Sequence, residues 1–469
     1  MSKELNNKKV INSWAMYDWA NSVFSLTIAT AIFPPYYESI SKAAAIASGS
    51  NPNGPYYLTF LGIKIVNTAL YSYALSLGFL LVTIFSPILS GIADARRNKK
   101  SFLKFFCYTG SLSCMLMYFF EPSTVFLGIA LFVISLFGFG GSIVFYNAFL
   151  PEIATEDQFD RVSARGFSMG YIGSVILLIA NLVTIMFPEL FFPVQSKAAE
   201  LLNASPILDQ ASATNAAKEY YVGIASRLSF VSVGIWWAGF AQITFRNLHE
   251  DAPENKYEGN ILSKGFNELK IVFNEIRNNQ EHGKIKRYLW GFFFTSMGLQ
   301  TVLYVASLFG SQELHLPTQD LIFTILIIQL IAILGAWGFS KVSNRIGNIY
   351  TIVVMIIVWI IICIIAYKIS TANEFYALGT LVGIVMGGIQ SMFRSTYAKL
   401  IPQETLDHAS YFSFYDVCEK LAIVLGTFSF GFLLDITGNM RSSVLALAVY
   451  FIIGLFFIAR IKNFKTLKA

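Results

Sequence analysis

Ionisable side chains within apolar stretches are the residues of this sequence best suited to chemistry. Asp18 lies about six residues into the first apolar stretch, roughly 9 Å deep at 1.5 Å per residue. A charged group inside a membrane segment is costly, so its presence indicates a function. We expect Asp18 to face a cavity and bind a substrate amine or a coupling proton, with Trp19, Asn21 and Ser22 beside it. The alternative is a packing role, with a basic partner on a neighbouring helix.

A second charged group comprises Asp416, Glu419 and Lys420. On a helix these positions lie within about 100° of one another, and Asp416 can pair with Lys420 at a spacing of four. That pairing would leave Glu419 as an unbalanced acid, free to exchange a proton or to meet a substrate charge. The alternative is a structural triad that satisfies its own charges.

Two arginines also lie at or within apolar stretches, Arg165 and Arg394. Either could pair with Asp18 or Glu419, or could bind a substrate carboxylate through two parallel hydrogen bonds. The alternative is that each side chain extends to the membrane interface. Uncharged groups could contact the same ligand or could join helices to one another; they are Tyr146, Asn147 and Gln390.

The composition shows which elements must position these residues. Of 469 residues, 55% are hydrophobic and only 13% are charged, against about a quarter charged in soluble domains. A span needs about 20 apolar residues, and we predict twelve spans, at 12–37, 67–92, 101–120, 124–149, 163–187, 223–246, 287–310, 320–341, 348–369, 375–399, 409–434 and 440–460.

The basic residues fix the expected orientation. With the N-terminus inside, the inner connections hold roughly 26 of the 34 Lys and Arg, and the outer ones hold about 7. Both termini are therefore predicted to be cytoplasmic, in a bacterial inner membrane or, alternatively, a vacuolar one. This asymmetry accounts for most of the net charge of +6, and no nucleic-acid partner is expected.

The predicted spans divide six and six around a long inner connection. We predict an N-terminal bundle at 1–246, a linker at 247–286 and a C-terminal bundle at 287–469. Apolar residues recur in the linker at helical spacing, which predicts an amphipathic helix either on the inner membrane face or packed on the bundle; they are Leu262, Phe266, Leu269, Phe273 and Ile276. The long outer loop at 188–222 shows no sign of a fold of its own.

Matching motifs in the two halves indicate a duplicated six-helix unit. A Gly-Gly pair precedes both FYNAFLPEI and FRSTYAKLIPQ, DRVSARGF corresponds to DHASYFSF, and GIADARRNKK corresponds to FSKVSNRIGN. Parallel repeats of this kind place a binding site near the membrane midplane, between the halves.

Several segments carry a family resemblance. WAMYDWANSVFS, FYNAFLPEIA, RVSARGFSMGYIG, GGIQSMFRSTYAKLIP and YFSFYDVCEKLAIVLG resemble the vacuole effluxer family within the major facilitator superfamily. The resemblance implies a transporter of twelve helices. For the eukaryotic members it implies export of neutral amino acids such as leucine and tyrosine, and for the bacterial members the substrate is poorly defined.

The turn after the second span resembles the superfamily's loop pattern, roughly G-x-x-x-D-R-x-G-R-K. Asp94 fits the acid, with Gly91 three residues before it, whereas Ala95 stands where an arginine is usual, and Asn344 replaces the acid in the second copy. We expect charges at these turns to pair across the two halves when the cytoplasmic side is shut. The candidate gate residues are Gly91, Asp94, Arg96, Arg97, Glu152 and Arg345.

These expectations describe an all-α membrane protein of two six-helix bundles with the major facilitator fold. We predict a secondary transporter that moves a small solute, a neutral amino acid, by alternating access coupled to protons, with facilitated efflux without a coupling ion as the competitor. The sequence predicts no enzyme activity, no cofactor, no metal site, contact with membrane lipid and a monomeric state. The alternatives are export of drugs, lipids or sugar-like solutes, or a non-transporting receptor or enzyme.

Overall fold

The computed structural model describes residues 5–51, 56–60, 62–204, 209–248, 261–278, 283–314, 316, 318–402, 405, 407–437 and 440–461. Within these residues nine helices are long and apolar enough to cross a membrane. The other three predicted spans correspond to the segmented first span and to two long helices that contain charged residues, α11 (Gly283–Glu313) and α15 (His408–Thr437).

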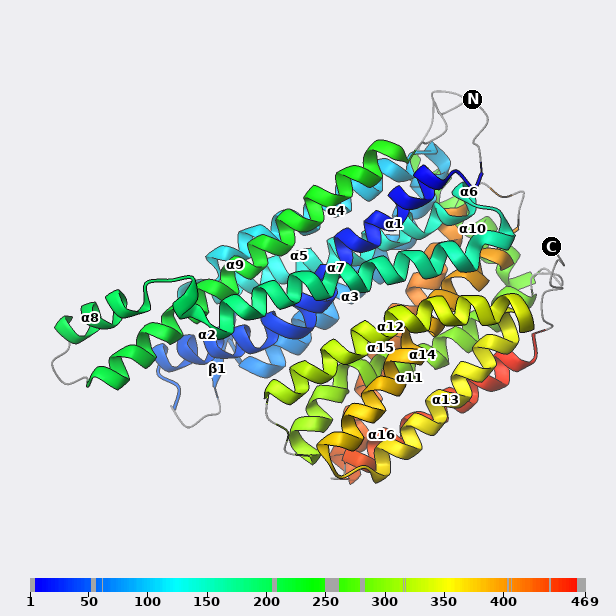
Figure 1. The fold of residues 1–469 in the computed structure, drawn as a ribbon. Helices are drawn as coiled ribbons and strands as arrows, with labels where there is room; N and C mark the ends of the chain where they lie inside the picture. Colours follow the sequence, from blue (N-terminus) through cyan, green and yellow to red (C-terminus); the bar gives the residue numbers. More distant parts are fainter. Residues whose placement is uncertain are drawn as a thin grey trace.

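The first half of the chain forms one helix bundle, drawn in blue to green in Figure 1. Its first span is built from α1, η1 and α2, and the first helix packs against the fifth and sixth spans. The segments are α1 (Lys8–Val23), η1 (Phe24–Ile32), α2 (Phe33–Ala47), α3 (Asn67–Arg96), α4 (Lys99–Leu116), α5 (Val125–Ala148), the short α6 (Leu150–Ile153), α7 (Phe159–Met186) and α9 (Gln210–Asn247).

The second half forms a second bundle, drawn in light green to red in Figure 1. Within it, α12 (Thr318–Ile346) and α14 (Ala372–Leu400) pack so closely through glycines that a side chain at Gly335 or Gly387 would overlap a backbone carbonyl of the other helix. The helices are α11 (Gly283–Glu313), α12 (Thr318–Ile346), α13 (Asn348–Lys368), α14 (Ala372–Leu400), α15 (His408–Thr437) and α16 (Met440–Ala459).

The two bundles meet along two seams. Along the first seam α15 packs against α3 and α5, and along the second seam α7 packs against α12 and α14. The start of α1 and the end of α16 lie at the same end of the molecule, here termed the terminus end (Figure 1). This arrangement agrees with the predicted all-helical, two-bundle fold.

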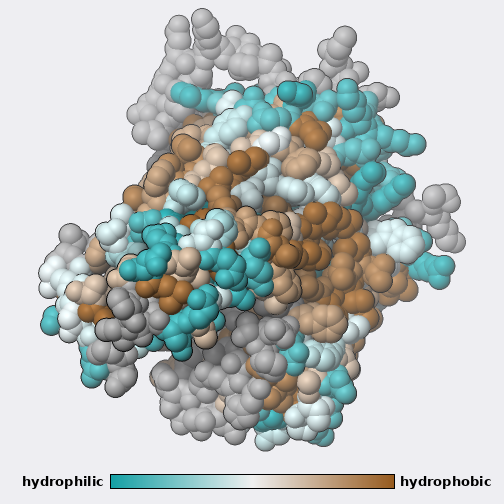
Figure 2. Space-filling view, turned by 60° about the vertical axis from the view of Figure 1, so that its left-hand side comes forward, coloured by the Kyte–Doolittle hydropathy of each residue, from teal (hydrophilic) through white to brown (hydrophobic). Residues whose placement is uncertain are grey.

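Large apolar side chains are exposed on the outer faces of the helices. Phe428, Leu334 and Ile235 each expose at least 60% of their surface, and Figure 2 shows a hydrophobic belt with hydrophilic residues gathered above it. An exposed apolar surface of this extent requires lipid as its solvent. The protein is therefore an integral, multi-pass membrane protein.

The middle of the first span is a nine-residue π-helix, η1. Pro34 and Pro35 follow it and have no N–H to donate to the carbonyls of the preceding turn. Within the π-helix, the Thr30 hydroxyl donates to the carbonyls of Ser25 and Leu26, at 2.5 and 2.9 Å. Segments of this kind occur at functional sites, because the widened turn changes which side chains face inward.

Both long connections at the end opposite the termini contain more structure than the sequence predicts. The connection after the first span holds the end of α2 and an antiparallel hairpin of β1 (Tyr57–Phe60) and β2 (Ile63–Val66), with Tyr57 opposite Val66. In the second connection, α8 (Val194–Ala204) packs on an extended start of α9 through Val194, Ala198, Ala213 and Ala217. The prediction that 188–222 has no fold of its own is wrong, because small alanines permit close helix packing.

The linker helix is α10 (Ile261–Asn278), and it packs on the bundle at the contact with α3, α11 and α15. Val272 and Ile276 are buried, and the Tyr411 hydroxyl of α15 donates to Glu275 at 2.6 Å. Of the two predicted positions, this is the packed one. The side chains of Leu262, Phe266 and Leu269 lie outside the described residues.

Candidate functional site

A cavity of about 730 Å³ lies between the two bundles. Helices of both halves line it, and so does the π-helix η1. Most of its wall is apolar, with many aromatic rings, and its charged lining residues are Asp18, Arg394, Glu419 and Lys420. A concave site with few converging polar groups is the usual form of a small-molecule site.

An ion pair joins the two halves at one end of this cavity. Arg394 Nη1 of α14 lies 3.1 Å from Asp18 Oδ2 of α1, and both side chains are nearly buried. The Tyr146 hydroxyl of α5 donates to the same carboxylate oxygen at 2.8 Å. The Asp18 carboxylate is thus held by one partner from each bundle.

The remaining nitrogens of Arg394 bind the first half as well. Nε donates to the Ser163 hydroxyl at 2.9 Å and Nη2 donates to the Ser163 carbonyl at 2.7 Å. The guanidinium carbon lies 4.1 Å from the ring centroid of Phe167 and 4.9 Å from that of Trp14. These contacts fix the guanidinium in one orientation. A lysine could not make the same contacts, because its ammonium lacks the planar arrangement of donors.

The uncharged candidates divide between the cavity and the helix contacts. Asn147 accepts a 3.4 Å hydrogen bond from Arg394, and Gln390 accepts one of 2.7 Å from Tyr171. Asn21 and Ser22 also line the cavity. Trp19 lies at a helix contact, where it stacks on Trp236. The charged candidate Arg165 lies elsewhere, exposed on α7.

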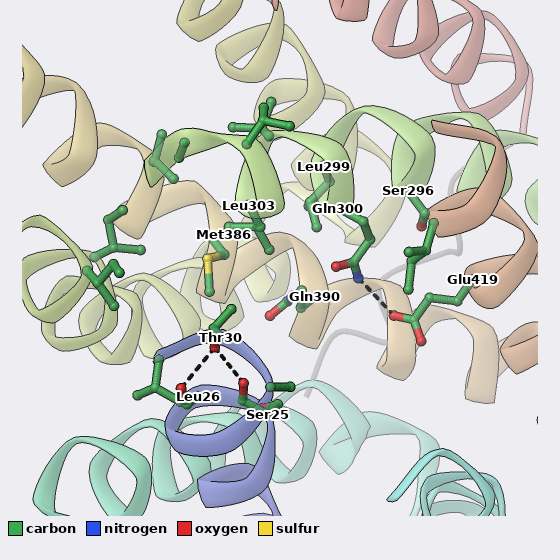
Figure 3. Close-up of a pocket in the computed structure, with 18 of the residues that line it drawn as sticks. Ser25, Leu26, Thr30, Ser296, Leu299, Gln300, Leu303, Met386, Gln390 and Glu419 are labelled. Carbon is green, nitrogen blue, oxygen red and sulfur yellow. Dashed lines mark hydrogen bonds between the residues drawn. The ribbon is translucent and has the colours of Figure 1, made fainter. Parts of the chain in front are cut away.

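The charged residues of α15 form a second group. Lys420 Nζ lies 2.8 Å from Glu419 and 3.4 Å from Asp416. Gln300 of α11 donates to Glu419 at 3.3 Å, and Figure 3 shows both side chains near Gln390. The expectation that Glu419 would be the unbalanced acid does not hold, because Glu419 has the shorter contact with the lysine.

The first seam is closed at the terminus end by Asp94. Its carboxylate accepts hydrogen bonds from the backbone N–H groups of Ala409 and Ser410, at 3.3 and 2.7 Å. These donors belong to the first turn of α15, where unpaired N–H groups and the helix dipole favour an anion. Lys99 lies 3.3 Å from Asp94 and 2.5 Å from Glu152. An acid of one half thus caps a helix of the other.

The second seam is closed by Asp160, at the start of α7. Its carboxylate accepts from the side chains of Ser343 and Asn348 at 2.8 and 2.7 Å, and Lys399 lies 2.9 Å away. All three partners belong to the second half. The two seams are therefore built alike but not identically, because the acid comes from the end of α3 in one and from the start of α7 in the other.

The other gate candidates have different surroundings. Arg96 and Arg345 are exposed, Gly91 is buried, and Arg97 is half-buried with a left-handed backbone at φ 52°. Glu152 belongs to the first seam, where His408 Nδ1 lies 3.4 Å from it. The structure thus brings Asp94 and Glu152 together and leaves the exposed arginines apart from that cluster.

Several residues of these networks were not predicted from the sequence. Ser163, Tyr171 and Gln300 are common polar residues of helix contacts, and nothing distinguishes them before the helices are placed. Asp160, Lys99 and Lys399 lie near span ends, where charged residues are ordinary. The one available signal was the recurrence of an acid at Asp160 and Asp407 in the two halves.

Comparison with known proteins agrees with this architecture. The sequence model of a family described as "Vacuole effluxer Atg22 like" matches residues 6–468. An uncharacterised MFS-type transporter of Bacillus subtilis, YxiO, is 29% identical over 96% of this chain and 94% of its own length. Autophagy-related protein 22 of Yarrowia lipolytica is 27% identical over 85% of this chain and 77% of its own.

Solved structures of similar fold are also transporters. FucP, a major facilitator superfamily transporter in an outward conformation, has a TM-score of 0.65 at 12% identity, covering 97% of this chain and 98% of its own. The proton:xylose symporter XylE has a TM-score of 0.66 at 11% identity, covering 97% and 96%. At this identity the likeness shows a shared fold.

Proposed function

Because the chain belongs to the Atg22-like vacuole effluxer family of major facilitator superfamily transporters, we propose that the solute it carries is a neutral amino acid. We further propose that both termini face the cytoplasm of a bacterial cell, that the protein is a monomer, and that transport is coupled to protons. The basic residues at the inner connections support the orientation.

The observation that carries the substrate proposal is the ion pair of Asp18 with Arg394 at the cavity wall. An α-amino acid has one ammonium and one carboxylate group. It can therefore insert between the two side chains, with its ammonium at Asp18 and its carboxylate at Arg394. Each buried charge would then exchange one partner for another and none would be left unpaired, which limits the cost of desolvation.

The seams support a mechanism of alternating access. Asp94 and Asp160 hold the halves together at the terminus end, which supports a cavity open to the opposite side. In the proposed orientation this is an outward-facing state. Opening inward requires both networks and the Asp18–Arg394 pair to separate, since all three cross between the halves.

A second candidate is a hydrophobic drug or lipid. The aromatic lining of the cavity favours it; the rings include Phe24, Phe139, Phe292, Phe309 and Phe375. Such a solute would leave Asp18 and Arg394 paired with each other, so the two candidates predict different consequences of removing the charge of Asp18.

Uptake into proteoliposomes tests the proposal. We expect purified protein to accumulate a radiolabelled neutral amino acid under an imposed pH gradient, and Asp18→Asn to abolish both accumulation and exchange because Arg394 loses its counter-charge. Glu189→Gln, an exposed acid of a loop, is the matched control and should transport normally. Failure of folded wild-type protein to move any amino acid, while it moves a drug or a sugar, would overturn the substrate assignment.

A further inference from the structure

The Asp416 carboxylate is buried without the donors that a buried carboxylate needs. Its side chain exposes 3% of its surface, and neither oxygen accepts a hydrogen bond within the described part of the chain. Lys420 Nζ, at 3.4 Å, is the cation beside it. An ionised carboxylate in this position would carry a large desolvation cost.

The charges around Asp416 do not balance. Asp416 and Glu419 are two acids, and both lie against the single ammonium of Lys420. The other charged groups of the cavity wall, Asp18 and Arg394, already neutralise each other. Two side chains from neighbouring helices contact these three charged residues, Gln300 of α11 and Phe79 of α3. Both side chains are uncharged. Among the residues that the structure describes, one negative charge of this group therefore has no counter-charge.

We infer that this group binds one exchangeable proton, carried on Asp416, and that this is the proton coupled to transport. Asp416 is assigned in preference to Glu419 because Lys420 and Gln300 both donate hydrogen bonds to Glu419, whereas Asp416 accepts none in the described residues. A metal ion does not fit, since the lysine ammonium already occupies the space between the carboxylates. The inference rests on the proposed proton-coupled transport and names its carrier.

The position of the group explains how a bound proton would follow the conformational cycle. Asp416 lies on α15, which packs on α3 and α5 along the first seam, and Lys420 Nζ lies 5.9 Å from the ring centroid of Phe79 on α3. When this seam separates, water reaches Asp416 from the terminus end. The proton then leaves its Oδ atom for that water, and closure of the seam onto a reprotonated Asp416 resets the cycle.

Infrared spectroscopy of the purified full chain tests the proton without any solute. We expect the carbonyl band of a protonated carboxylic acid at neutral pH, and its loss in Asp416→Asn. We also expect its loss in Glu419→Gln, because Lys420 then neutralises Asp416 alone. Glu189→Gln should retain the band. A wild-type protein without the band, or a band that persists in either of the first two variants, would overturn the inference.

Transport assays test the coupling. Asp416→Asn imitates the protonated side chain, so counterflow of solute should continue at the wild-type rate while accumulation driven by a pH gradient is lost. Retained accumulation, or loss of counterflow in folded protein, would contradict the assignment. If wild-type protein moves no amino acid, the proposed substrate fails, and the infrared experiment still decides the proton site by itself.

Discussion

At the residue scale, the contact between the two halves depends on a glycine, Gly166, beside the ion pair. A Cβ atom at Gly166 would overlap Asp18 Oδ2 and would lie 2.7 Å from Arg394 Nη2. Glycine at this position therefore lets α7 approach the ion pair closely enough for Ser163 to bind the guanidinium. The pair is as much a product of helix packing as of charge.

We expect Gly166→Ala to separate Asp18 from Arg394. Overpacking of this kind costs about 1–3 kcal/mol, so the variant should unfold at a lower temperature in detergent and lose about tenfold or more in counterflow rate. The control is Gly239→Ala on α9, where no atom lies within 4 Å of the added Cβ. Equal behaviour of the two variants would show that the close packing at Gly166 does not matter.

The sequence identifies Asp18 and Arg394 but not their pairing. Ionisable residues within apolar stretches stand out because of their cost, and both residues are found that way. The pair is separated by 376 positions, and two arginines with two acids allow several pairings. Tyr146 is a candidate from the sequence, whereas Ser163 binds Arg394 through a hydroxyl and a carbonyl that many helix residues offer, so only the placed helices distinguish it.

At the element scale, the first turn of α15 is held by an acid from the other half. Asp94 accepts two backbone N–H groups that the helix itself cannot satisfy. Hydropathy predicts α15 as a span, because length and apolar content suffice for that. The π-helix η1 was not predicted, because Pro34 and Pro35 indicate a break without indicating which hydrogen bonds replace the lost ones.

We expect Asp94→Asn to favour opening of the first seam. The amide keeps one acceptor and loses the charge that the helix dipole favours, a change of about 1–2 kcal/mol, or about tenfold in the opening equilibrium. A cysteine placed at the buried Ser410 should react about tenfold faster with a thiol reagent in this background. Asp157→Asn, an acid exposed at the same end, should leave the labelling rate unchanged, and an unchanged rate in Asp94→Asn would exclude the capping role.

At the scale of the whole molecule, two separate networks close one end. The Asp94 network and the Asp160 network share no residue in the described contacts. The repeated motifs predict two related halves, and the structure confirms the fold. They do not predict that the acid of the second seam is Asp160, since the last turn of α12 contains Asn344 instead of an acid.

We expect the effects of Asp94→Asn and Asp160→Asn on opening to add in free energy, because both act on one equilibrium through separate contacts. Spin labels at the exposed positions 96 and 345, one in each half, would report the distance between the bundles. In the double variant, the equilibrium constant for opening should increase by the product of the factors by which the two single variants increase it. A double variant no more open than Asp94→Asn would show that the seams open as one unit.

The glycine contact of α12 with α14 has a consequence for the route by which solutes arrive. Some carriers of membrane-soluble compounds admit cargo sideways, through a portal between two helices. Here the two backbones touch at Gly335 and Gly387, with Ala332 and Ile384 opposite them, and no acyl chain can pass between helices in such contact. Cargo dissolved in the bilayer therefore cannot reach the cavity by passing between α12 and α14.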